Sequence, residues 1–284
     1  AATIGVAYER AGEPHRSATA GWYNSAAFQQ EADHDGLPAW NVNGDAFTDA
    51  VKDEVIDRIQ SKFGEVDFII YSFAAPRRID PATGEIYSSV IKPIGRPFIS
   101  KGVEFLTGHI TNMIAEPATE EEVAHTVKVM GGEDWELWIQ RLLHEKVLAP
   151  GALTIALSYI GPELTRAIYR DGTIGRAKAD LEATAKRLDA LLKTSDGSAV
   201  ISVNKALVTR ASAVIPGVSL YISLLYKAMK ERKLHEGCIQ QMDRLYRDFL
   251  FTEKDLPQDD EGRIRLDDWE MRSDVQEAVA ESWE

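Results

Sequence analysis

The segment Val66-Asp-Phe-Ile-Ile-Tyr71-Ser-Phe-Ala-Ala-Pro76 decides the fold, because it joins an apolar strand to a turn of small residues. Positions 66–71 are rich in β-branched and aromatic residues, which favour a strand. Small residues directly after the carboxyl end of a strand suit a place where the backbone approaches a flat ligand. The same residues also suit an ordinary turn, so the neighbouring elements must decide between the two.

The elements around this segment alternate between helices and strands. Before it, positions 49–62 carry apolar residues at Val51, Val55, Ile56 and Ile59, a spacing typical of one helix face. In chain order, the other predicted elements are a strand at 38–42, helices at 120–129 and 135–145, a strand at 151–159, a helix at 174–192 and a strand at 199–204. This βαβ rhythm predicts the α/β class, with a Rossmann-like doubly wound parallel sheet.

Two segments depart from the alternating pattern. Residues 77–117 are rich in Gly, Pro and Thr, and we interpret them as an excursion with one small hairpin. Residues 213–230 are strongly apolar and predict a helix, which either lines an acyl pocket or is simply buried structure. We expect a helical extension at about 212–252 to cover a substrate. Because no flexible linker separates these parts, residues 1–284 are predicted to form a single domain.

The chain begins within a strand pattern, because residues 2–8 form a largely apolar run that is followed at once by Glu9. In a dinucleotide-binding unit, an acidic residue after the second strand holds the adenosine ribose, about 20 residues beyond a glycine-rich phosphate loop. Such a loop would fall before residue 1. We therefore expect the first βα unit to be absent from this chain.

Tyr169 and Lys178 are the most informative pair of chemical groups, because a phenol and an ammonium can form a proton-donating pair. On one continuous helix, nine positions rotate a side chain by about half a turn, so the two groups would point in opposite directions. However, Asp171-Gly172 is a turn signal, and Thr173 can cap a new helix. Tyr169 is therefore predicted at a loop or helix end and Lys178 in the second turn of the next helix, where the two can converge.

Composition excludes several classes of function. The formal net charge is -13, and no cluster of Lys and Arg of the kind that binds nucleic-acid phosphates occurs. No apolar run reaches the length of a membrane-spanning helix, and we see no signal peptide at the start. The single cysteine, Cys238, excludes an internal disulfide, suits the cytoplasm and is interpreted as a small core residue.

Other catalytic chemistries lack their residues. The six histidines, at positions 15, 34, 109, 125, 144 and 235, never pair at metal-ligand spacing, so we expect no metal. The Gly-x-Ser-x-Gly motif of serine hydrolases and the Gly-Lys-Ser/Thr loop of nucleotide hydrolases are both missing from the sequence. Neither type of enzyme is therefore expected.

Six motifs are more specific than these patterns. They are Gly21-Trp-Tyr-Asn24, Gly44-Asp-Ala-Phe47, Val129-Met-Gly-Gly-Glu-Asp-Trp135, Ser158-Tyr-Ile-Gly-Pro-Glu163, Asp171-Gly-Thr-Ile-Gly175 and Thr209-Arg-Ala-Ser-Ala-Val-Ile-Pro216. With them, the whole chain resembles the trans-2-enoyl-CoA reductases, also known as the FabV type of enoyl-[acyl-carrier-protein] reductase. This family is a branch of the short-chain dehydrogenase/reductase superfamily.

The resemblance implies an activity and a set of site residues. The activity is NADH-dependent reduction of the carbon–carbon double bond of trans-2-enoyl thioesters in fatty acid synthesis, on enoyl-CoA or enoyl-acyl-carrier-protein, by a monomer. Tyr169 would donate the proton, Lys178 would bind the nicotinamide ribose and Tyr159 would contact the substrate. The other implied cofactor contacts are Tyr8 and Glu9 at the adenosine ribose, Asp45 and Ala46 at the adenine, Phe73 and Ala74 at the adjoining backbone, and Leu207, Val208 and Thr209 at the nicotinamide end.

Two other functions remain open. A carbonyl or alcohol dehydrogenase of the short-chain type would use the same tyrosine and lysine, although the apolar stretch 213–230 favours an acyl substrate. A chain without the glycine-rich loop could also be a catalytically silent binding module. As to the cofactor, Glu9 favours NADH because a carboxylate repels the 2′-phosphate of NADPH, whereas the adjacent Arg10 can bind that phosphate.

Overall fold

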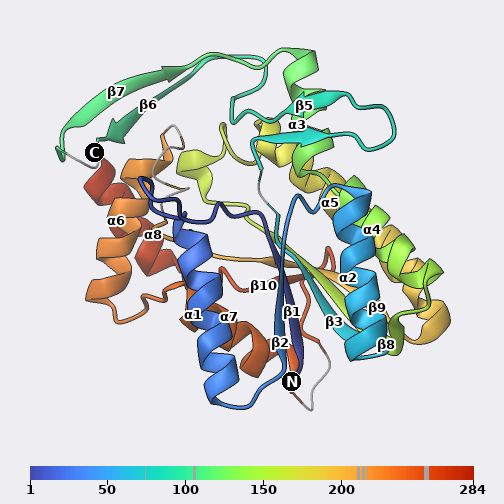
Figure 1. Cartoon of the computed structure of the whole chain (residues 1–284). Helices are drawn as coiled ribbons and strands as arrows, with labels where there is room; N and C mark the ends of the chain where they lie inside the picture. The colour runs from blue at the N-terminus through green and yellow to red at the C-terminus, as the bar shows by residue number, and fades with distance from the viewer. Residues whose placement is uncertain (74, 105–106, 210–211, 213–214, 216, 253–255) are drawn as a thin grey trace.

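Parallel strands form the centre of the protein (Figure 1). The computed structural model describes residues 1–284 except 74, 105–106, 210–211, 213–214, 216 and 253–255. One sheet has the order β10-β9-β8-β3. Its strands are β3 (Val66–Tyr71), β8 (Leu148–Ser158), β9 (Ser198–Val203) and β10 (Arg263–Arg265). A second parallel pair consists of β1 (Thr3–Ala7) and β2 (Ala39–Asn43). The predicted parallel α/β arrangement is confirmed.

A cavity of about 830 Å³ lies between the two sheets. Ile4 and Val6 of β1 line it from one side, and Phe68 and Ile70 of β3 line it from the other. Among the described residues, no backbone pairing joins β1 to β3. The parallel strands therefore form two parts, and the cavity separates them.

Helices cover both faces of the four-stranded sheet. α2 (Asp49–Lys62), α4 (Glu133–His144) and α5 (Thr173–Leu192) pack into a core with Ala156. The neighbouring residue Ile155 belongs to a separate core, with Leu245 of the π-helix Leu245–Leu250 that continues α7 (Cys238–Arg244). Adjacent residues of β8 thus point to opposite faces, as the alternation along a strand requires. The sheet is therefore doubly wound, as predicted.

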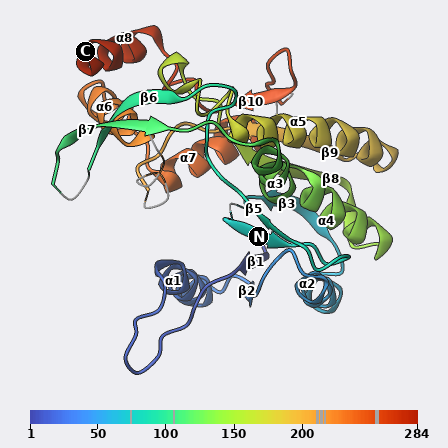
Figure 2. The same ribbon diagram turned by 90° about the horizontal axis from the view of Figure 1, so that it is seen from above.

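A third core lies beside the sheet and is built on α6 (Val218–Glu231) and α8 (Ser273–Trp283). Tyr221 and Met229 of α6 are fully buried in it, together with Val275 and Val279 of α8. Figure 2 shows the two helices beside the hairpin of β6 (Phe98–Val103) and β7 (Ile110–Ala115). The helix predicted within 213–230 is thus confirmed from Val218 onward, whereas Ile215 and Gly217 precede its first turn. Most of its apolar residues are core, but Tyr226 is exposed.

The excursion at 77–117 contains two hairpins, whereas the sequence predicted one. β4 (Arg77–Ile79) pairs with β5 (Ile86–Ser88), and β6 pairs with β7. The second hairpin is fixed to the helical extension, because the Val103 amide donates to Ser219 Oγ of α6 at 3.2 Å. Helix α3 (Glu120–Met130) then begins with a capping box formed by Thr119 and Glu122.

Other differences from the predicted elements have simple causes. Helix α1 (Ala20–His34) was not predicted, because only Ala32 is buried in it and its sequence shows no apolar stripe. β10 is only three residues long, too short for a pattern. The short 3₁₀ helices Glu163–Thr165 and Lys193–Ser195 also escaped prediction. The interpretation of Cys238 as a core residue is wrong, because the residue is exposed at the start of α7.

Candidate active site

The parallel strands place most of the predicted site residues at their carboxyl ends. Open α/β sheets bind ligands at this edge. Ala74 lies outside the described residues. The others follow five strands: Tyr8 and Glu9 follow β1, Asp45 and Ala46 follow β2, Phe73 follows β3, Tyr159 follows β8, and Leu207, Val208 and Thr209 follow β9.

Tyr169 lies in the turn before α5, as the turn signal predicted. Its amide donates to the Thr165 carbonyl at 2.9 Å. The N-cap of α5 is Gly172, so the expected capping role of Thr173 is wrong. The Thr173 hydroxyl instead donates to the Val90 carbonyl at 2.5 Å, and it accepts from the Lys92 amide at 3.2 Å. A segment of the excursion therefore holds this turn in place.

Lys178 lies in the second turn of α5, again as predicted. Its Nζ donates to the Leu157 carbonyl at 3.2 Å, near the carboxyl end of β8. The ring of Tyr169 contacts the ring of Tyr159, which follows the same strand, with 4.9 Å between ring centroids and an interplanar angle of 84°. The phenol and the ammonium therefore both reach the carboxyl end of β8.

The surroundings shift the pKa of both groups. Burial and the negative charge of Glu270 raise the pKa of Tyr169 to about 12. Burial lowers the pKa of Lys178 to about 8, partly opposed by Glu182. At neutral pH the phenol is thus fully protonated and the lysine is largely charged. Both causes of the shift in the Tyr169 pKa favour the neutral phenol.

Glu270, which lies between β10 and α8, was not predicted as a site residue. Its Oε1 accepts hydrogen bonds from the hydroxyls of Tyr159 at 2.9 Å and Tyr221 at 2.6 Å. Its Oε2 accepts from the Ala206 amide at 2.6 Å. Glu270 is fully buried, and burial raises its pKa. No local pattern marked it, because the acidic tail around it is typical of a solvated segment.

Glu9 presents its carboxylate at the amino end of α1. The Asn43 side chain fixes its backbone, accepting from the Glu9 amide at 2.7 Å and donating to the Glu9 carbonyl at 2.8 Å. A Cβ at Gly21 would lie 1.9 Å from Glu9 Oε1, so the carboxylate occupies space that only glycine leaves open. Among the described residues, the Glu9 carboxylate has no hydrogen bond or ion pair. It is therefore available to a ligand.

The loop of Asp45 and Ala46 is anchored by the buried ion pair of Lys52 and Asp134. Lys52 Nζ donates to the carbonyls of Ala46 at 2.9 Å and Phe47 at 3.0 Å, and to Asp134 Oδ1 at 2.9 Å. Lys52 is 3% exposed and Asp134 is 2% exposed. The Asp45 carboxylate accepts from the Phe47 amide at 3.0 Å. The loop after β2 is thus rigidly shaped.

The segment after β9 is more open. Val208 is 54% exposed, whereas Ala206 is buried. Thr209 and Ser212 hydrogen-bond each other, with the Thr209 amide donating to Ser212 Oγ at 2.9 Å. This segment begins at the Ala206 amide that Glu270 holds, so Glu270 connects it to the tyrosines.

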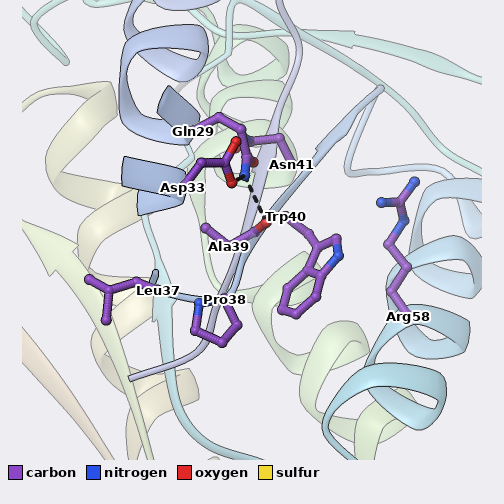
Figure 3. A pocket seen from close by; sticks show the side chains of 8 residues that line it. All are labelled: Gln29, Asp33, Leu37, Pro38, Ala39, Trp40, Asn41 and Arg58. Carbon is purple, nitrogen blue, oxygen red and sulfur yellow. Dashed lines mark hydrogen bonds between the residues drawn. The ribbon is translucent and has the colours of Figure 1, made fainter. Parts of the chain in front are cut away.

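A separate open pocket of about 550 Å³ lies at α1, β2 and α2 (Figure 3). Gln29 of α1 donates to the Ala39 carbonyl within it at 3.0 Å. None of the predicted site residues lines this pocket. Phe73 instead lines the cavity between β1 and β3.

The described residues include no group of three or more His, Cys, Asp and Glu side chains that could hold a metal ion. In the same part of the chain, no helix is long and apolar enough to cross a membrane.

A doubly wound parallel sheet, with a tyrosine and a lysine at its carboxyl edge, defines an α/β oxidoreductase. Comparison with known families identifies the branch. Residues 16–251 match the model described as the trans-2-enoyl-CoA reductase catalytic region, and residues 258–284 match one described as the enoyl reductase FAD binding domain. The chain belongs to the trans-2-enoyl-CoA reductase family.

Individual relatives are similar over the whole chain. An enoyl-[acyl-carrier-protein] reductase [NADH] of Coxiella burnetii is 55% identical, over 100% of this chain and 70% of the relative. The crystal structure of Clostridium acetobutulicum trans-2-enoyl-CoA reductase in complex with NADH is 46% identical, with a TM-score of 0.97, over 100% of this chain and 71% of that one. The Treponema denticola enzyme in complex with NAD is 51% identical, with a TM-score of 0.95, over 99% and 70%.

Proposed function

We propose that this chain reduces the carbon–carbon double bond of trans-2-enoyl thioesters with NADH. The observation that carries the proposal is that Tyr169 and Lys178 both reach the end of β8, one through the Tyr159 ring and the other through the Leu157 carbonyl. The relatives named for this reaction, and those crystallised with NADH or NAD, support it.

The residues at the strand ends suit a dinucleotide. The Glu9 carboxylate is free to accept hydrogen bonds from ribose hydroxyls, and Tyr8, 78% exposed, offers its ring beside it. The rigid loop of Asp45 and Ala46 would bind the adenine. Val208, on the open segment after β9, would lie at the nicotinamide end.

When bound, NADH supplies a hydride to the β-carbon of the substrate. Negative charge then develops on the thioester oxygen, and a donor must already be in place to stabilise it. The Tyr169 phenol, with its pKa raised to about 12, is a neutral donor at cellular pH. We propose that Tyr169 would donate its proton to the enolate formed at the thioester oxygen, and that Lys178 would bind the nicotinamide ribose.

We further propose how the chain is organised around this site. Residues 1–284 would act as one reductase unit, in which α6, α7 and the π-helix cover the acyl chain. Tyr159 would contact the substrate, which is carried on coenzyme A or on acyl carrier protein. The protein would act as a monomer in the cytoplasm.

One assay tests the activity and separates the alternatives. NADH absorbance is followed with crotonyl-CoA, with acetoacetyl-CoA and with neither, for this chain and for a form extended at its amino terminus. Oxidation with crotonyl-CoA alone supports the proposal. Oxidation with acetoacetyl-CoA alone would identify a carbonyl reductase. Absence of oxidation by either form with every substrate, crotonyl-acyl-carrier-protein included, would indicate a binding module. A fourth arm with crotonyl-acyl-carrier-protein decides between the two carriers.

A further inference from the structure

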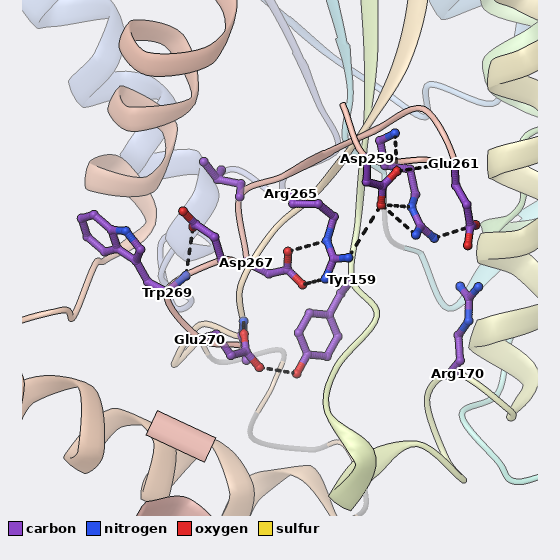
Figure 4. Close-up of polar contacts among 12 residues, drawn as sticks. Tyr159, Arg170, Asp259, Glu261, Arg265, Asp267, Trp269 and Glu270 are labelled. Atoms are coloured by element: carbon purple, nitrogen blue, oxygen red, sulfur yellow. Dashed lines mark hydrogen bonds and ion pairs between the residues drawn. The ribbon is translucent and has the colours of Figure 1, made fainter. Parts of the chain in front are cut away.

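Glu270 connects three separate parts of the candidate site. Its carboxylate accepts from Tyr159 after β8, from Tyr221 of α6 and from Ala206 after β9. All three partners are donors, which suits an ionised carboxylate, because it can only accept. Figure 4 shows the Glu270 carboxylate turned toward the Tyr159 hydroxyl.

The neighbouring Gln276 fixes the direction of one of these hydrogen bonds. Gln276 Nε2 donates to the Glu270 carbonyl at 2.7 Å and to the Tyr221 hydroxyl at 3.2 Å. An amide nitrogen only donates, so the Tyr221 oxygen must accept, and its own proton is directed to Glu270. The network therefore has a definite polarity.

This polarity distinguishes the two tyrosines that contact each other. The Tyr159 proton is committed to Glu270. The Tyr169 hydroxyl, in contrast, makes no hydrogen bond to another residue that the structure describes. The anchored Tyr159 ring therefore packs against the Tyr169 ring and limits its movement. The hydroxyl proton of Tyr169 remains free for donation to the substrate.

We propose that Glu270 is a positioning residue of the reductase: it anchors Tyr159 and Tyr221 and the start of the nicotinamide-side segment at Ala206, and so fixes Tyr169 relative to the cofactor. This inference rests on the proposed function. Its distinctive consequence is that Glu270 acts on turnover through Tyr159, without touching the reacting atoms.

Asp267 provides a matched control on the same segment. It is 1% exposed, and its two carboxylate oxygens accept from Arg265 at 2.8 and 2.7 Å (Figure 4). Asp267→Asn removes a buried negative charge, as Glu270→Gln does, but among the described residues the Asp267 carboxylate hydrogen-bonds to Arg265 and to no tyrosine. A merely structural loss should therefore affect both variants alike.

The test combines kinetics with a spectroscopic signature. Displacement of a positioned group by about 1 Å costs on the order of 100-fold in rate. We therefore expect the kcat of Glu270→Gln with crotonyl-CoA to fall by about 100-fold. Its KM for NADH should change by less than about threefold. Asp267→Asn should keep kcat within about threefold of wild type. In the double variant Glu270→Gln/Tyr159→Phe, the losses should fall well short of multiplying, because both substitutions break the contact between Glu270 and Tyr159.

NMR spectra of protein with ¹³C-labelled tyrosine report the ring carbon of Tyr159 that bears the hydroxyl. The chemical shift of this carbon should change in Glu270→Gln and stay the same in Asp267→Asn. Losses that multiply in the double variant would overturn the inference, as would an unmoved Tyr159 signal. Wild-type protein that oxidises NADH neither with crotonyl-CoA nor with crotonyl-acyl-carrier-protein would instead refute the proposed function. The ¹³C spectra would then still decide whether Glu270 anchors Tyr159.

Discussion

The ring of Tyr159 meets the ring of Tyr169 edge-on, with their centroids 4.9 Å apart, and Glu270 binds the hydroxyl of Tyr159. Two phenols in contact are thereby made chemically different. One is held by a buried carboxylate, and the other keeps its proton for a ligand. The Tyr169 ring thus packs against an anchored neighbour, although Tyr169 lies outside a regular helix.

Replacing Tyr169 with Phe should remove the proton donor and preserve the ring contact. A positioned general acid typically contributes about 10² to 10⁴-fold, so we expect kcat with crotonyl-CoA to fall within that range while the Kd for NADH stays within about twofold. Stopped-flow absorbance and NADH fluorescence measure the two quantities. Tyr226→Phe, at an exposed position on α6, is the control. Turnover like that of wild type in Tyr169→Phe would remove Tyr169 from the mechanism.

Lys178 should give the enzyme a basic limb in its pH profile. Because burial lowers its pKa to about 8, the ammonium is present below that pH and is lost above it. The value of kcat/KM for NADH reports the free enzyme, so it should fall above pH 8 by up to about tenfold per pH unit. Lys178→Arg stays charged, and its basic limb should move above about pH 10. A wild-type profile that is flat to that pH would contradict the assignment.

Gly21→Ala should weaken NADH binding without unfolding the protein. The added Cβ would lie 1.9 Å from Glu9 Oε1, and the flexible carboxylate would have to move away. Losing a hydrogen bond from a charged group costs about 1.5–3 kcal/mol, so we expect the Kd for NADH to rise about 10 to 100-fold with little change in Tm. Gly12→Ala is the control, because its nearest neighbouring atom is 3.6 Å away. An unchanged Kd in Gly21→Ala would argue against Glu9 as a ribose ligand.

Breaking the Lys52–Asp134 ion pair should destabilise the protein strongly. Lys52→Met leaves a buried carboxylate unpaired, which costs about 3–5 kcal/mol in the free energy of unfolding. Within the described part of the chain, the Asp134 carboxylate then keeps one hydrogen bond, from the Tyr71 hydroxyl at 3.3 Å. Urea denaturation measures the loss, and Lys52→Met/Asp134→Leu should recover part of it. As a control, Glu54→Ala breaks an exposed pair with Arg58 and should cost less than about 1 kcal/mol. Equal losses in Lys52→Met and Glu54→Ala would show that burial of the first pair has no energetic weight.

Periodicity alone located most of the sheet and its covering helices. The predicted bounds of α2 and β3 match the structure at both ends, because an apolar stripe and a β-branched run leave little ambiguity. The turn between Tyr169 and α5 was also predicted, from Asp171-Gly172. Helix α1 and strand β10 were missed, because neither has a repeating apolar pattern.

The sequence by itself determined the strand ends, and therefore which residues stand at the ligand-binding edge. It also determined that Tyr169 and Lys178 are divided between a turn and a helix. Only the tertiary structure decided what surrounds them. Glu270 reaches the tyrosines from 101 positions beyond Tyr169 in the chain, and the carbonyl that holds Lys178 belongs to a strand 21 residues away. The spacing of apolar and turn residues in the sequence predicts the contacts that a residue makes within its own helix or strand. Hydrogen bonds between distant segments depend instead on how the helices and strands pack together.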